Sequence, residues 1–146
     1  MAIRDALCLL SDAQAVTADA VSTNSYDSAA AGNEIGIGEP LALVITVDVA
    51  ADSTTGDETY VFEFIESAAA ALTSPTVLVE RAVAAASLTA GAQVVLPLPP
   101  DAKSKRYLGA QYDVGGTTPT ITVTAFIAPL SSVQNYKAYA DAITIN

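Results

Sequence analysis

The sequence contains no histidine and no tryptophan, and it has a single cysteine, Cys8, among 146 residues. Without histidine, the chain lacks the commonest general base, the usual base of serine and cysteine triads, and a frequent zinc ligand. One cysteine excludes an internal disulfide and a thiolate metal cage within one chain. With no histidine to activate it, we interpret Cys8 as a small buried or interfacial residue. We therefore expect no enzyme, no metal site and no cofactor.

Basic residues are also scarce. Six Lys and Arg stand against 16 Asp and Glu, which gives a formal net charge of −10, and charged residues make up only 15% of the chain. Such a surface repels a phosphate backbone unless its few cations gather in one patch. Only KSKR, residues 103–106, approaches such a patch, and in so acidic a chain we interpret it as a solvated loop. We expect no nucleic-acid partner, and the low charge content favours a surface that faces other protein.

Long apolar runs are missing as well. No stretch reaches the ~18 apolar residues that a membrane helix needs, so we expect no membrane partner. The opening MAIRDALCLL is interrupted by Asp5 and is too short for a signal peptide. We expect it to remain part of the mature protein.

The sequence does contain a period-two alternation of apolar residues, interrupted at short intervals by turn-forming residues. In TYVFEFIES, residues 59–67, Tyr60, Phe62 and Phe64 share one face, which we expect to point into the core. The predicted strands are 14–23, 41–50, 59–67, 74–83, 92–100, 105–116, 119–128 and 142–146. This spacing predicts an all-β, eight-stranded jelly-roll-like sandwich with extended terminal arms.

The chain length favours a single domain, residues 1–146, with a core large enough to need no covalent staples. Its two ends carry apolar and aromatic residues without a clear period. We interpret residues 1–12 as an N-terminal arm and residues 130–146 as a C-terminal tail, which fold back on the domain or reach a neighbour. The candidate partner-contact residues in these segments are Ile3, Leu7, Leu9, Leu10, Tyr136 and Tyr139.

Carboxylates are the remaining source of chemistry. Alternation places Glu63 and Glu66 on opposite faces of one strand, which argues against a catalytic pair. DSTTGDETYVFE, residues 52–63, superficially suggests a calcium loop, but its helix–loop–helix spacing fails and Asp57 stands at the glycine position. We interpret these acids as solvated strand-edge charges.

Four separated stretches carry a family resemblance. They are SDAQAVTADAVSTNSYD, EIGIGEPLALVITVDVAAD, LTAGAQVVLPLP and KRYLGAQYDVGGTTPTITVTAFI. In order and spacing they resemble the capsid cement (decoration) proteins of tailed phages, of the type found in a Bordetella phage, over residues 11 to about 128. The most specific parts are the AQAVTA…ST opening, the GIGEPL stretch and the RYL…Y.V.G segment.

The resemblance implies a jelly-roll domain that assembles as homotrimers on the outer surface of an icosahedral phage head and clamps neighbouring subunits of the major capsid protein. The expected partners are therefore the major capsid protein and other copies of the chain, and the expected location is the outside of the capsid in the virion. Such a clamp needs no histidine and no metal, and it gains from apolar arms where subunits meet. Two alternatives stay open: a glycan-binding adhesive β-module of a phage or cell surface and, as a distant third, a carboxylate enzyme.

Overall fold

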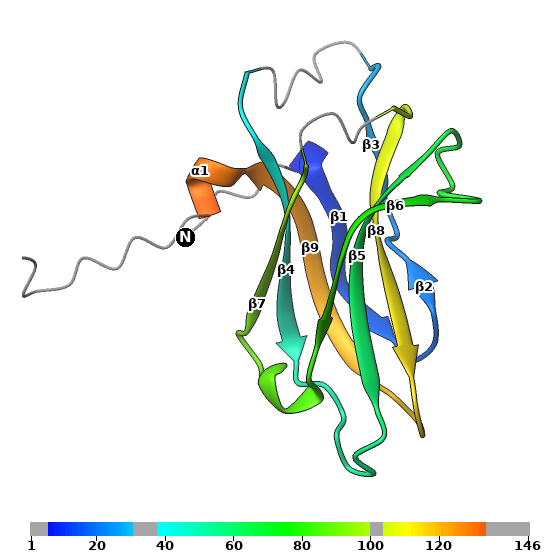
Figure 1. Ribbon diagram of the computed structural model, residues 1–146, viewed down its shortest axis with the longest axis vertical. Helices are drawn as coiled ribbons and strands as arrows, with labels where there is room; N and C mark the ends of the chain where they lie inside the picture. The colour runs from blue at the N-terminus through cyan, green and yellow to red at the C-terminus, as the bar shows by residue number, and fades with distance from the viewer. Residues whose placement is uncertain (1–5, 31–37, 100–103, 134–146) are drawn as a thin grey trace, which may run out of the picture.

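Figure 1 shows a computed structural model, which describes residues 6–30, 38–99 and 104–133. Its strands are β1 (Leu9–Val16), β2 (Ala20–Val21), β3 (Tyr26–Asp27), β4 (Leu41–Val49), β5 (Thr59–Ser67), β6 (Thr76–Val83), β7 (Gln93–Pro97), β8 (Tyr107–Gly115) and β9 (Ile121–Pro129). Short 3-10 helices lie at Ala6–Cys8 and Ala85–Ser87, and the four-residue helix α1 (Leu130–Val133) follows β9. Among these residues no helix is long and apolar enough to cross a membrane.

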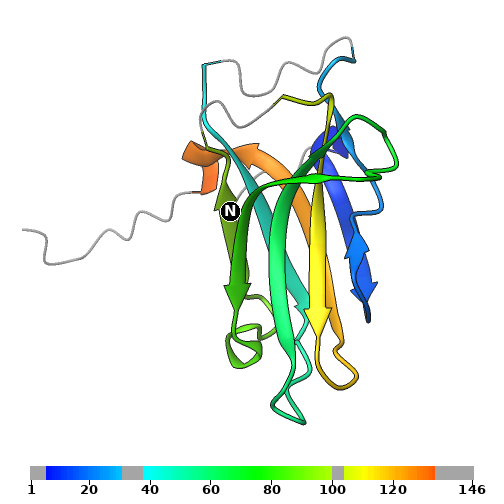
Figure 2. The same ribbon diagram turned by 45° about the vertical axis from the view of Figure 1, so that its right-hand side comes forward.

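The strands form two antiparallel sheets that pack face to face. One sheet has the order β1-β9-β4-β7 and the other the order β2-β8-β5-β6, and β3 also pairs with β8. Figure 2 shows the sheet with β5, β6 and β8 in front of the sheet with β4 and β9. The chain crosses between the sheets from β4 to β5, from β6 to β7, and again at each of the next two connections, as in a jelly roll. The predicted all-β sandwich is confirmed.

The core lies between the two sheets, and the predicted inward face of β5 forms part of it. Tyr60, Phe62 and Phe64 are each 1% exposed or less. The rings of Phe62 and Tyr112 meet edge to face, with centroids 6.3 Å apart. Tyr112 donates its hydroxyl proton to Ser11 Oγ at 2.8 Å, because the Ser11 proton is given to Gln14 Oε1 at 2.6 Å. The buried hydroxyl is therefore satisfied, as a polar group in a core must be.

The N-terminal part of the sheet differs from the prediction. A strand was predicted at 14–23, but β1 begins at Leu9 and ends at Val16, and only β2 remains of the second half. The pairing of β1 with β9 is interrupted by two register shifts, and Ala13 has a positive φ of 46°. Such irregularities break the alternation that marks a strand, so the pattern hid the start of β1. The predicted strand at 142–146 lies outside the described residues.

The side chains of β6 do not follow a simple alternation. Alternation along the predicted strand 74–83 would place Val77, Val79 and Val83 on one side, but of these only Val79 and Val83 pack against the core, whereas Val77 is 42% exposed. A register shift between Phe64 and Ile65 in the β5–β6 pairing separates Val77 from the other two. One extra residue moves all later side chains to the opposite face.

The connection between β5 and β6 covers one end of the outer face of its sheet. Leu72 in this connection is only 3% exposed and lies directly over Gly109 of β8. A Cβ atom on Gly109 would stand 2.3 Å from Leu72 Cδ1, so a larger residue there would force the Leu72 side chain to move. Ile65, which pairs with Gly109, is 0% exposed. The outer face of this sheet is therefore partly buried.

Candidate functional site

The predicted contact residues have three different environments. Ile3, Tyr136 and Tyr139 lie outside the described residues, so their role stays a prediction. Leu7 is 67% exposed, which suits a contact residue. Beside it, Cys8 is 4% exposed and belongs to the core cluster, in agreement with its interpretation as a small buried residue.

The prediction for Leu10 is wrong. Leu10 was predicted to be a contact residue of a free arm, but it is 1% exposed and packs in the core between the sheets. Leu9 belongs to β1 and pairs with Phe126 of β9, so the arm predicted at 1–12 ends before Leu9. The physical reason is the irregular β1 pairing described above, which removed the alternation expected of a strand.

Leu9 lies in a second apolar cluster, separate from the main core. This cluster contains Val44, Phe126 and Ala128, with Leu9 and Val133 packed against it. Alternation along β4 and β9 places these side chains on the outer face of the β1-β9-β4-β7 sheet. Leu9 is only partly buried there, so it keeps some area for contact with another surface.

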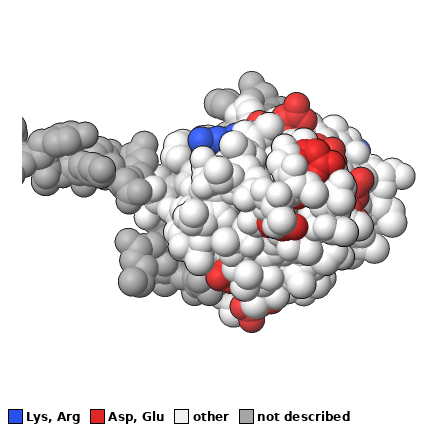
Figure 3. Space-filling model, turned by 90° about the horizontal axis from the view of Figure 1, so that it is seen from below, with Lys and Arg blue, Asp and Glu red and all other residues white. Residues whose placement is uncertain are grey.

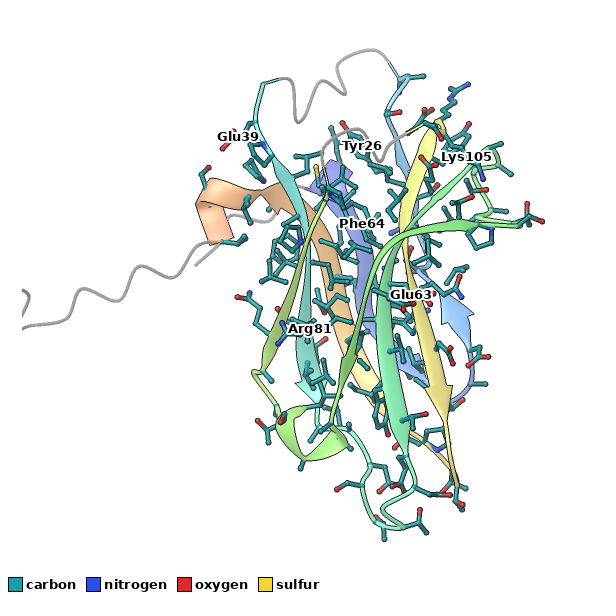
Figure 4. All side chains as sticks on the ribbon, viewed as in Figure 1. Tyr26, Glu39, Glu63, Phe64, Arg81 and Lys105 are labelled. Atoms are coloured by element: carbon teal, nitrogen blue, oxygen red, sulfur yellow. The ribbon has the colours of Figure 1, made fainter. Side chains whose placement is uncertain are left out.

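The outer face of the other sheet holds an unusual carboxylate. Glu63 of β5 stands directly between Glu80 of β6 and Gln111 of β8. Figure 4 shows Glu63 midway along its strand. The side chain is 7% exposed, and its Oε2 atom has no hydrogen-bond partner in the described part of the chain.

The charge around Glu63 is uniformly negative. Burial raises the pKa of the Glu63 carboxyl above its usual value, and the negative charges of Asp113, Glu80 and Asp19 raise it further. We call Asp19, Glu63, Glu80 and Asp113 the acidic face. Sequence reasoning treated Glu63 as a solvated charge and missed this group, because its members come from four separate segments of the chain.

Glu66, also on β5, shows how a buried carboxylate is normally accommodated. It is 2% exposed and accepts hydrogen bonds from the backbone N–H groups of Ser104 and Lys105 at 2.7 and 2.8 Å and from Ser104 Oγ at 2.8 Å. Burial by itself would raise the pKa of Glu66, but these hydrogen bonds outweigh it and the pKa is lowered. Glu66 therefore anchors Ser104 and Lys105 of the basic KSKR motif.

The basic motif is used for structural contacts. Arg106 donates two hydrogen bonds to Asp27, from Nε at 2.7 Å and from Nη2 at 2.8 Å. This bidentate pair, above all its hydrogen bonds, lowers the pKa of Asp27 to about 2. Lys105 donates from Nζ to Thr76 Oγ1. These contacts favour the interpretation of KSKR as a surface loop, now with defined partners.

The acids of the β4–β5 connection serve their own turns. Asp52 accepts from the backbone and hydroxyl of Thr54, and Glu58 accepts from Thr55 and from the Gly56 N–H. Gly56 has a φ of +79°, which suits glycine at this turn. Within residues 6–30, 38–99 and 104–133, no group of three acidic or thiol side chains has metal-binding spacing. Figure 3 views the molecule from this end and shows acidic side chains at several places.

The strand order and the paired sheets define the class as an all-β sandwich of jelly-roll type. The sequence profile of the family described as Bbp16 matches residues 10–128, and the chain belongs to this phage-related family. No curated protein matches the chain. Among solved structures, it is similar to the one described as "Crystal structure of PBSX exported protein XepA", with 14% sequence identity and a TM-score of 0.43. That match covers 94% of this chain and 40% of the XepA chain.

Proposed function

We propose that this protein is a capsid cement protein, which binds the outer surface of an icosahedral phage head and stabilises the lattice of the major capsid protein. The observation that carries the proposal is the Bbp16 family match over residues 10–128. The same part of the chain contains the four stretches that resemble cement proteins of the Bordetella-phage type. The jelly-roll strand order agrees with the fold that this resemblance implies.

A cement protein works by burying surface on neighbouring capsid subunits at once. Leu7 is exposed and Leu9 is half-buried, so both have apolar area to lose on docking. Burial of such area contributes about 25 cal/mol per Å², and ordering of the contact side chains offsets part of this gain. The contribution of each copy is therefore modest, but it is multiplied by assembly as a homotrimer and by repetition over the shell.

The test compares heads assembled with and without the protein. Cryo-electron microscopy should reveal the sandwich on the outer surface, and the decorated heads should break at a higher temperature than bare ones. Light scattering after size exclusion measures the expected trimer. Bare heads after saturation with the protein would contradict the proposal, and specific binding to a glycan array would favour an adhesive module instead.

The proposed role is structural and involves no turnover. A panel of glycan, ester and peptide substrates checks this directly. Hydrolysis that is abolished by Glu63→Gln or Asp57→Asn would identify a carboxylate enzyme and contradict the structural role.

A further inference from the structure

Glu63 is poorly stabilised compared with the other buried acids. Glu66 receives three hydrogen bonds, and Glu58 is held by a turn, whereas Glu63 Oε2 has no partner within the described residues. A buried carboxylate without a donor or a cation is costly. A partner that supplies a cation at this face would provide the contact that Glu63 lacks.

The neighbours of Glu63 make this cost larger. Glu80 lies directly opposite in the β5–β6 pairing, where two like charges destabilise a sheet. Arg81 is next to Glu80 in the sequence, but it pairs with Phe62, whose ring points into the core, so alternation directs Arg81 away from the acidic face. The ion pair found in the described part of the chain, Arg106 with Asp27, is a separate contact.

We propose that the acidic face is the docking site for a basic side chain, arginine or lysine, on the surface of the major capsid protein. This inference rests on the proposed cement function and names the contact that carries it. Asp19, Glu80 and Asp113 are exposed and meet the incoming cation first, while Glu63 adds a fourth negative charge beneath them. Because Glu63 is buried, the effective dielectric around it is low, and this strengthens its attraction to that cation.

The geometry favours an organic cation over a metal ion. A hard metal ion needs several oxygen ligands arranged around one point, and no group of three acids with such spacing occurs in the described segments. A guanidinium group does not need ligands arranged around one point, because its five N–H donors lie in one plane and can reach several neighbouring carboxylates. The net charge of −10 adds long-range attraction for a basic partner surface.

The experiment measures binding of the full-length protein to heads that lack it. The test variant, Glu80→Gln with Asp113→Asn, removes two of the three exposed charges of the acidic face and leaves the core untouched. The control, Asp12→Asn with Glu39→Gln, removes the same charge from two other exposed positions. Thermal unfolding of both variants checks folding, and the test variant should be at least as stable as the wild type because it loses like-charge repulsion.

The test variant should bind about tenfold more weakly than the wild type, and its binding should depend less on salt, whereas the control should stay within about twofold. A test variant that binds like the wild type overturns the docking site, and so does an equal loss in the control. Loss of wild-type binding on addition of a chelator assigns the face to a metal ion and also overturns it. Wild-type protein that leaves heads bare contradicts the cement function itself.

Discussion

Leu10→Ala and Leu7→Ala make the same chemical change in the same short segment, but the first should lower stability and the second should weaken binding to heads. Leu10 is 1% exposed in the main core, so its truncation leaves a cavity and should cost about 2.7–5 kcal/mol. That is a large share of the roughly 5–15 kcal/mol that stabilises a domain. At about 3 °C per kcal/mol for a chain of this size, Tm should fall by about 8–15 °C. Leu7 is 67% exposed, and its truncation should change stability by less than about 0.5 kcal/mol.

The assay combines urea and thermal unfolding, followed by circular dichroism, with binding to undecorated heads. Leu7→Ala should keep the wild-type Tm and bind heads more weakly, and deletion of residues 1–7 should do the same because β1 begins at Leu9. Deletion through Leu10 should compromise folding. A loss below about 1 kcal/mol for Leu10→Ala would refute its place in the core. Unchanged head binding by Leu7→Ala would remove Leu7 from the contact.

Other substitutions test the acids of β5 and the core. Glu63→Gln should stabilise the protein by about 1–2 kcal/mol at pH 7. Because the pKa of Glu63 is raised, the stability of the wild type should fall as the pH rises from 4.5 through the raised pKa. The Tm values of the wild type and Glu63→Gln should therefore converge at acid pH. A variant that is less stable than the wild type at pH 7 contradicts this prediction. Glu66→Gln should cost about 1.5–3 kcal/mol of stability at pH 7. Because the pKa of Glu66 is lowered, this difference from the wild type should vanish as the pH falls from 4.5 through the lowered pKa. A stability difference that is constant with pH argues against stabilisation of Glu66 by its hydrogen bonds. Phe62→Ala should cost about 3–5 kcal/mol in urea unfolding, and a loss near zero would exclude its ring from the core.

The local pattern of the chain was sufficient to predict the class of fold and much of the core. Alternation is a property of neighbouring residues, so Tyr60, Phe62 and Phe64 could be assigned to the inward face before any strand pairing was known. The same alternation marks the core residues of β9, which are Ile121, Val123, Ala125 and Ile127. Extended strands and short turns are encoded within a few residues, which is why strands β4 to β9 were found near their observed positions.

The local pattern could not predict features that depend on pairing between distant segments. Leu10 is a core residue because β1 pairs with β9, more than 100 residues away in the chain, and the bulges in that pairing concealed the strand. Glu63 and Glu66 look alike in the sequence, yet Glu66 meets donors 38 and 39 residues further along, whereas Glu63 meets other acids. The partners of a side chain on a sheet are set by strand register, which is a long-range property. Hydrophobic alternation determines which face a residue occupies, and only the folded sheets determine what it finds there.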